Sequence, residues 1–181
     1  MHLVAAAGLL LLAACGDDSV APAPDSGAEA GADAFTPYDA SLPDSGPCNA
    51  LVLTAPPTTD HVVTDAQAPV PDGGTIAPGL YFLTDTSVYL VGDAGAPPLG
   101  TRREVHSFDD AGLWQTLTTS DDGGATRLAL AVAAEGVTLH RVVICPPDIK
   151  SKDGEFTASG TSLSLFDYNG GVVTVFTLTK Q

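Results

Sequence analysis

The sequence has few basic residues, seven Lys and Arg against 22 Asp and Glu, which gives a formal net charge of −15 at pH 7. All seven lie between Arg102 and Lys180. A protein that binds nucleic acid needs a basic surface to neutralise phosphates. We therefore exclude nucleic acid as a partner and interpret the acidic surplus as an aid to solubility.

The sequence also lacks a hydrophobic run long enough to cross a membrane as a helix. The run at 3–14 has twelve small or apolar residues, whereas a spanning helix needs about 20. Residues 1–14 are therefore predicted to be a signal peptide. Met1 and His2 do not supply the Lys or Arg that usually precedes such a run, which leaves the true start codon open.

Leu12, Ala13, Ala14 and Cys15 follow this run in the order of a bacterial lipobox, and the motif resembles that of lipoprotein precursors. The resemblance implies cleavage before Cys15 and a diacylglycerol on its sulfur, with palmitate-type acyl chains anchoring the protein in a membrane. We expect a location in the bacterial cell envelope, at the outer membrane in preference to the inner. The alternative is an ordinary secretory signal with Cys15 near its cleavage site.

Residues 16–47 contain almost nothing that could form a core, since 27 of these 32 residues are Ala, Pro, Gly, Ser, Asp or Glu. Their seven acidic residues repel one another, and five prolines oppose a helix. We predict lipidated Cys15 and a disordered acidic linker over 15–47, followed by a single β domain over 48–181.

The chain has only three cysteines. If Cys15 carries lipid, Cys48 and Cys145 remain as a pair in an oxidising compartment, and we predict a disulfide between them. Two separate buried thiols or a shared metal are the alternatives. Two cysteines without histidine at ligand spacing argue against zinc.

From residue 79 onward, runs of β-type residues alternate with turn signals, and no long amphipathic helical period interrupts them. Asn169-Gly170-Gly171 is typical of a hairpin turn. Residues 51–78, which are rich in Pro, Thr and Asp, are predicted to be an irregular lead-in lying over the core. The predicted strands are 80–91, 102–108, 113–120, 126–133, 137–145, 155–158, 161–168 and 172–179.

Short turns between consecutive strands predict an antiparallel meander, and eight such strands remove their exposed edges by closing into a barrel. The predicted fold is therefore all-β, an eight-stranded antiparallel up-and-down barrel, with a two-sheet β-sandwich as the alternative.

Gly79-Leu80-Tyr81 at the first strand and Lys180 after the last resemble the lipocalin and calycin group. In that group Gly-x-Trp starts the first strand, and an arginine near the end packs across the aromatic ring at the closed end of the barrel. Here Tyr and Lys take those two places, and the group's long helix is not seen. The resemblance implies a lipocalin-like cup for a small apolar molecule.

Alternation along the strands predicts which side chains face the barrel interior. Leu128, Leu130 and Val132 are expected inside, as are Phe176 and Leu178, whereas the pattern over 161–168 is ambiguous.

The strand at 113–120 leaves the position of the chain's single tryptophan open. If Leu113 and Leu117 point inward, Trp114 points outward; if Trp114 points inward, Thr116 and Thr118 come with it and the lumen is partly polar. Packing on the barrel's end or outer surface is the simpler role for Trp114. The candidate ligand contacts are Trp114, Tyr81, Tyr89 and Phe176.

Residues that could support catalysis do not form a recognisable pattern. His61, His106 and His140 fall on different elements without ligand spacing, and Gly-x-Ser-x-Gly is absent. The paired turn aspartates at 109–110 and 121–122 do not match an EF-hand loop, so calcium is a minor alternative there. We expect no enzymatic activity, no cofactor and no metal.

The sequence therefore favours a non-catalytic envelope lipoprotein whose tethered barrel binds a small apolar or amphipathic ligand. The alternative is a structural or protein-interaction module with a solid core, which contacts an envelope protein through its outer surface.

Overall fold

The computed structural model describes residues 47–64, 66–121 and 123–181. The predicted signal peptide, Cys15 and nearly all of the predicted linker lie outside these residues. The described part contains no helix that is long and apolar enough to cross a membrane. Its ten strands are β1 Thr58–Thr59, β2 His61–Val63, β3 Gly79–Leu90, β4 Thr101–Phe108, β5 Leu113–Ser120, β6 Ala125–Glu135, β7 Thr138–Cys145, β8 Gly154–Ser159, β9 Ser162–Asn169 and β10 Val172–Lys180.

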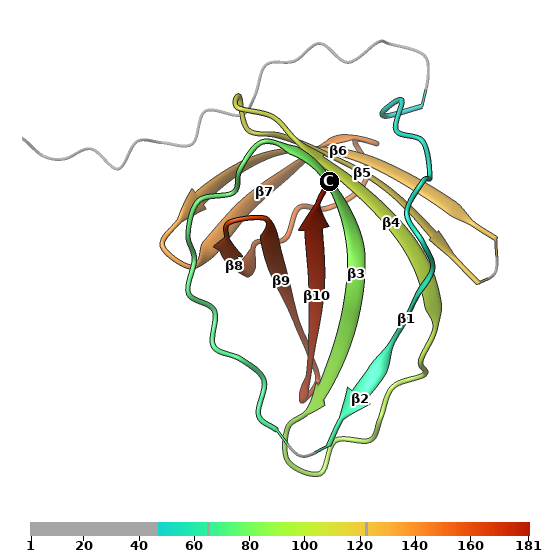
Figure 1. The fold of residues 1–181 in the computed structure, drawn as a ribbon, viewed down its shortest axis with the longest axis vertical. Helices are drawn as coiled ribbons and strands as arrows, with labels where there is room; N and C mark the ends of the chain where they lie inside the picture. The colour runs from blue at the N-terminus through green and yellow to red at the C-terminus, as the bar shows by residue number, and fades with distance from the viewer. Residues whose placement is uncertain (1–46, 65, 122) are drawn as a thin grey trace, which may run out of the picture. The chain divides into compact units, whose positions relative to one another are not determined.

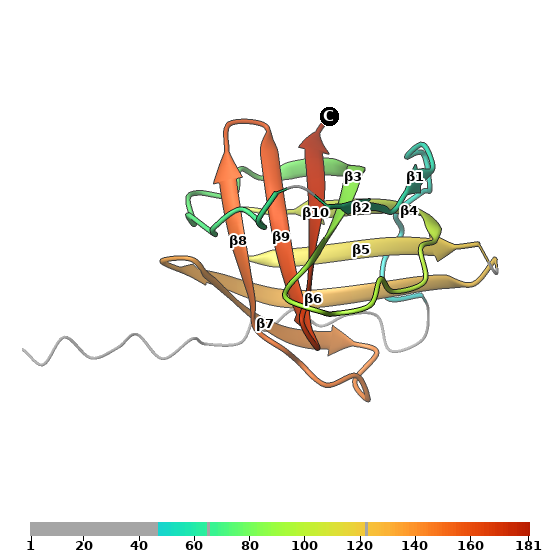
Figure 2. The same ribbon diagram turned by 90° about the horizontal axis from the view of Figure 1, so that it is seen from below.

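Strands β3 to β10 form a closed barrel (Figure 1, Figure 2). Each strand pairs antiparallel with the next in the chain, and β10 returns to pair antiparallel with β3. The predicted eight-stranded up-and-down barrel is thus confirmed. The ends of the predicted strands differ from the observed ones by at most two residues.

The turn between β4 and β5 illustrates why the strand ends are so regular. Asp109 Oδ1 accepts hydrogen bonds from the backbone N–H groups of Ala111 and Leu113 at 2.9 and 2.8 Å. Gly112 has a φ of +83°, and a Cβ there would lie 2.7 Å from the Val132 carbonyl oxygen. An aspartate followed by a glycine therefore fixes both the reversal and its contact with β6.

The segment predicted to be an irregular lead-in contains two short strands, so that part of the prediction was wrong. β3 and β4 pair directly over four residues each: the first four of β3, Gly79–Phe82, pair with the last four of β4, Val105–Phe108. Beyond this point β2 pairs in parallel with β3, and β1 pairs with β4. The lead-in forms strands there because the diverging edges of β3 and β4 present N–H and C=O groups that need partners.

The start of the lead-in is fastened to the outside of the barrel. Cys48 and Cys145 form the predicted disulfide, with an S–S distance of 2.01 Å and a Cα–Cα distance of 5.4 Å. The Asn49 side-chain amide donates to the carbonyls of Thr116 and Leu128 at 2.8 and 2.9 Å. The lead-in is therefore bonded to β5, β6 and β7 at their outer surface.

A strap of residues 73–78 closes the barrel end at which β3 begins. The Gly73 N–H donates to the Phe156 carbonyl at 2.9 Å, and the Gly73 carbonyl accepts from Ala158 at 2.7 Å. Ile76 of the strap packs against the buried core. That core is formed by Tyr81, Leu83, Phe108, Trp114, Leu130, Leu139, Phe156, Leu163 and Leu178.

The closed end also holds the residues that carry the lipocalin resemblance. Lys180 is the cross-strand partner of Tyr81. A Cβ at Gly79 would lie 2.6 Å from Lys180 Cε, so the lysine side chain crosses directly over this glycine. The arrangement is compatible with the resemblance, and membership of that group stays a prediction.

Most of the predicted facings are confirmed. The buried core cluster includes Leu130 and Leu178. Three further side chains are partly buried and pack against it, namely Leu128, Val132 and Phe176. In the ambiguous strand β9, Leu163 and Leu165 point inward, whereas Phe166 joins an outer cluster with Val173 and Val175.

Candidate functional site

A cavity of about 320 Å³ lies within the barrel, walled by six of its strands. Its wall combines apolar side chains from β6, β9 and β10 with hydroxyls and charged groups from β4, β5, β7 and β9. The buried core occupies the barrel interior toward the closed end, and this cavity lies beside it. The lining includes Glu104, His106, Trp114, Thr116, Thr118, Leu128, Leu130, Arg141, Leu165, Asp167 and Phe176.

Aromatic rings form the boundary between the solid end and the cavity. Trp114 is 4 % exposed and stacks on Phe108, with ring centroids 5.2 Å apart and an interplanar angle of 17°. Phe108 in turn meets Tyr81 edge to face at 5.5 Å. Trp114 therefore points inward together with Thr116 and Thr118, so a placement on the outer surface was wrong, whereas its packing at the filled end is observed.

Trp114 begins a chain of polar contacts that runs along β4. Its indole Nε1 donates to His106 Nδ1 at 3.1 Å, so the lone pair is on Nδ1 and the ring proton is on Nε2. His106 Nε2 is 3.0 Å from Glu104 Oε2 and donates to it. Arg102 Nη1 lies 3.8 Å from Glu104 Oε1, and its Nη2 lies 3.0 Å from Asp60 Oδ2.

This chain fixes the inward side chains of β4 without leaving an unpaired charge. Glu104 and His106 are 8 % and 4 % exposed, and burial of such groups is tolerated when they are paired and hydrogen-bonded. Arg102 also places its guanidinium 5.3 Å from the centre of the Phe176 ring. The chain therefore orients two aromatic rings of the cavity, Trp114 and Phe176.

Arg141 on β7 is the cationic residue of the cavity lining. Its Nε donates to the Lys152 carbonyl at 2.6 Å, and its guanidinium carbon lies 6.0 Å from the centre of the Trp114 ring. Burial lowers the pKa of Arg141, an effect that the nearby carboxylates of Asp167 and Asp153 oppose.

The loop between β7 and β8 lies beside the cavity and is bonded to β7 and to β9. Ser151 Oγ accepts from the Val143 N–H at 2.9 Å, and Lys152 Nζ pairs with Asp167 Oδ1 at 2.9 Å. The Asp167 carboxylate of the lining is thus paired with a lysine from this loop.

The four predicted ligand contacts are not brought together. Trp114 and Phe176 line the cavity. Tyr81 lies in the filled end, where burial raises its pKa and its hydroxyl donates to the Ala77 carbonyl at 2.6 Å. Tyr89 packs on the outer cluster of Phe166, Val173 and Val175.

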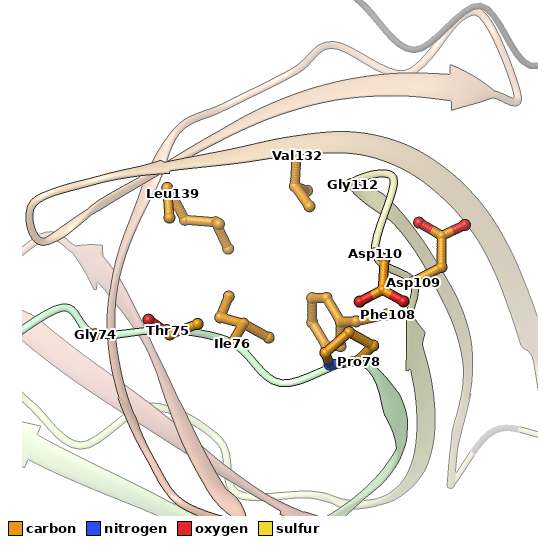
Figure 3. Close-up of a pocket in the computed structure, with 11 residues that line it drawn as sticks. Gly74, Thr75, Ile76, Pro78, Phe108, Asp109, Asp110, Gly112, Val132 and Leu139 are labelled. Carbon is orange, nitrogen blue, oxygen red and sulfur yellow. The ribbon is translucent and has the colours of Figure 1, made fainter.

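A second depression of about 430 Å³ lies at the closed end, between the strap and the β4–β5 and β6–β7 turns (Figure 3). Ile76 points from the strap toward Val132 and Leu139, and Asp109 and Asp110 stand at one rim. Asp109 Oδ1 is already bonded to the backbone of its turn. We select the interior cavity because convergent buried polar groups within an apolar wall characterise ligand sites.

Sequence reasoning missed Glu104, His106 and Arg141 as lining residues. The positions of Glu104 and His106 could have been predicted. The short turn between β4 and β5 pairs Phe108 with Trp114, and alternation along β4 then places His106 and Glu104 on the same face of the sheet as Phe108. Within residues 47–64, 66–121 and 123–181, no group of three or more His, Cys, Asp and Glu is arranged to hold a metal ion.

Comparison with known proteins adds no relative. No protein-family model matches the chain, and neither the curated proteins nor the solved structures contain a significant match to it.

Proposed function

We propose that this protein is a binding protein, without catalytic activity, that holds a small molecule with an apolar body inside its barrel. The observation that supports this proposal is the cavity between the filled end and the polar chain of β4, with Leu128, Leu165 and Phe176 in its wall. It is the reason for preferring ligand binding over a structural or protein-interaction module with a solid core.

The cavity volume limits the size of the ligand. Ligand pockets span roughly 300–1,000 Å³, so 320 Å³ is at the low end. A water molecule occupies about 30 Å³ of liquid, and the cavity therefore has room for roughly ten non-hydrogen atoms. A molecule of the size of an eight-carbon chain with one polar group meets this limit.

Trp114 provides a direct test because it is the chain's only tryptophan and lines the cavity. Titration with 1-octanol, octanoate and 3-phenylpropionate should change its fluorescence in a saturable way, and calorimetry should give the same affinities. Native mass spectrometry of the protein purified from its own host should also detect a bound mass of this class.

A matched pair of variants on β5 separates the interior from the surface. Thr118 lines the cavity, and its neighbour Thr119 faces the opposite side of the strand. Thr118→Phe should fill the cavity and reduce binding at least tenfold, whereas Thr119→Phe should leave it within twofold. Equal affinities for both variants, or no binding of any probe, would exclude the interior site.

We also propose, from the lipobox alone, that the protein is anchored to a bacterial envelope membrane through acylated Cys15. Metabolic labelling with an alkyne fatty acid should modify the wild-type protein and not Cys15→Ser. Labelling of both, or of neither, would contradict this proposal.

A further inference from the structure

We propose that the ligand carries a carboxylate and that Arg141 binds it, an inference that rests on the proposed ligand-binding function. It specifies the chemical class of the ligand: a small monocarboxylate with an apolar body.

The guanidinium of Arg141 has free hydrogen-bonding capacity. Nε is occupied by the Lys152 carbonyl, whereas neither Nη forms a hydrogen bond to any residue that the structure describes. In the same part of the chain, no carboxylate oxygen lies within 4.0 Å of the side-chain nitrogens of Arg141, and Asp153 Oδ1 instead accepts from its backbone N–H at 3.2 Å. Arginine presents paired N–H groups in the planar arrangement that a carboxylate accepts.

The acidic groups of the cavity are, by contrast, already paired. Glu104 is bonded to His106 and lies near Arg102, and Asp167 is bonded to Lys152. A cationic ligand would have to displace one of these partners. A neutral ligand would bury Arg141 further without giving it an anion, which costs free energy.

The surroundings of Arg141 favour one negative charge over two. Asp167 and Asp153 interact with the guanidinium electrostatically from beyond ion-pair distance. They would repel a dianion such as an alkyl phosphate more strongly than a monoanion. The Trp114 ring beneath the guanidinium and the apolar wall around it match a hydrocarbon body.

Gly154, the first residue of β8, provides the space in which the guanidinium lies. A Cβ at this position would be 2.7 Å from Arg141 Nη2. Gly154→Ala should therefore shift the guanidinium without removing its charge. This variant tests the position of Arg141 separately from its presence.

The experiment compares octanoate, 1-octanol and octyl phosphate by calorimetry on the wild-type protein, Arg141→Gln, Arg141→Lys and Gly154→Ala. Wild type should bind octanoate at least tenfold more tightly than 1-octanol. Arg141→Gln should lose at least tenfold for octanoate and stay within twofold for 1-octanol. Arg141→Lys and Gly154→Ala should give intermediate losses, also only for octanoate.

Arg103→Gln is the matched control, because Arg103 is exposed on the outward face of β4. It should leave every affinity within twofold. The circular dichroism spectrum of each variant should match that of the wild type, which checks that the variant folds. Should Arg141→Gln fail to fold, Arg141→Lys and Gly154→Ala still provide the comparison.

The two proposals fail in different ways. Equal binding of octanoate and 1-octanol, unchanged by the Arg141 variants, would overturn the carboxylate inference and leave the ligand-binding function intact. Tighter binding of octyl phosphate would overturn the choice of a monoanion. No binding of any of the three probes would remove the binding function and this inference with it.

Discussion

Trp114 connects the filled end of the barrel to its cavity. One face of its ring stacks on Phe108, its N–H is donated to His106, and Arg141 lies over it. The residue therefore contributes to the core and to the site at once. For the same reason, the fluorescence of Trp114 should change if a ligand occupies the cavity, as proposed.

The contact between His140 and Asp153 makes the stability of the fold depend on pH. Its Nδ1 lies 2.9 Å from Asp153 Oδ2, and this hydrogen bond, with a further one to Glu135, raises the pKa of His140 above its ordinary 6.5. The same contact lowers the pKa of Asp153 below its ordinary 3.8. The pair stabilises the fold fully between these two ordinary values, pH 3.8 and 6.5.

The sign of each shift sets how this stabilisation disappears. The His140 contribution is lost as the pH rises through its raised pKa, and the Asp153 contribution is lost as the pH falls through its lowered pKa. NMR titration should give a His140 midpoint above 6.5 that moves toward 6.5 in Asp153→Asn. Asp148→Asn, in the same loop, is the control and should leave the midpoint unchanged.

Among the elements, the strap of residues 73–78 has the strictest backbone requirement. Gly73 has a φ of +68°, and a Cβ there would lie 2.1 Å from the Gly136 carbonyl oxygen. A positive φ costs an L-residue about 1–2 kcal/mol, and the backbone clash adds to it. Gly73→Ala should therefore lower the free energy of unfolding by at least about 2 kcal/mol in urea denaturation.

Gly95 supplies the comparison for the strap, since no atom lies within 4 Å of a Cβ built there and no positive φ is found. Gly95→Ala should change the unfolding free energy by less than about 0.5 kcal/mol. If the two variants were equally stable, the strap would not depend on the geometry described for Gly73.

The strand boundaries could be predicted from the sequence because glycine and aspartate at the turns determine them locally, as at Asp109 and Gly112. The facing of β5 could not, because each of its faces carries a buried large side chain. Trp114 is buried inside the barrel, and Leu117, on the opposite face, is 3 % exposed. Alternation identifies the core side only where one face is polar.

Two further features could not be read from local patterns. The strands β1 and β2 exist because β3 and β4 diverge, which is a property of the closed barrel. The inward position of Arg141 could not be predicted, since a charged side chain inside a barrel contradicts the usual hydropathy pattern. Such a departure is where function is expected to outweigh packing.

At the scale of the whole molecule, the disulfide constrains most of the domain. Cys48 and Cys145 are 97 residues apart, and a loop of this length corresponds to about 4–5 kcal/mol in the chain-entropy model. Cys48→Ser with Cys145→Ser should lose stability of this order in urea denaturation. Reduced wild type should match the double variant, and a double variant as stable as oxidised wild type would contradict the expectation.

The pairing of β3 with β10 has a consequence for how the chain is made. β10 is synthesised after the other seven strands of the barrel, and it pairs with β3, which is synthesised before them. Until its nine residues emerge, β3 and β9 remain open edges, the form of sheet that recruits other chains and proteases. A chain terminated before Val172 would leave the sheet open, so closure of the barrel depends on β10.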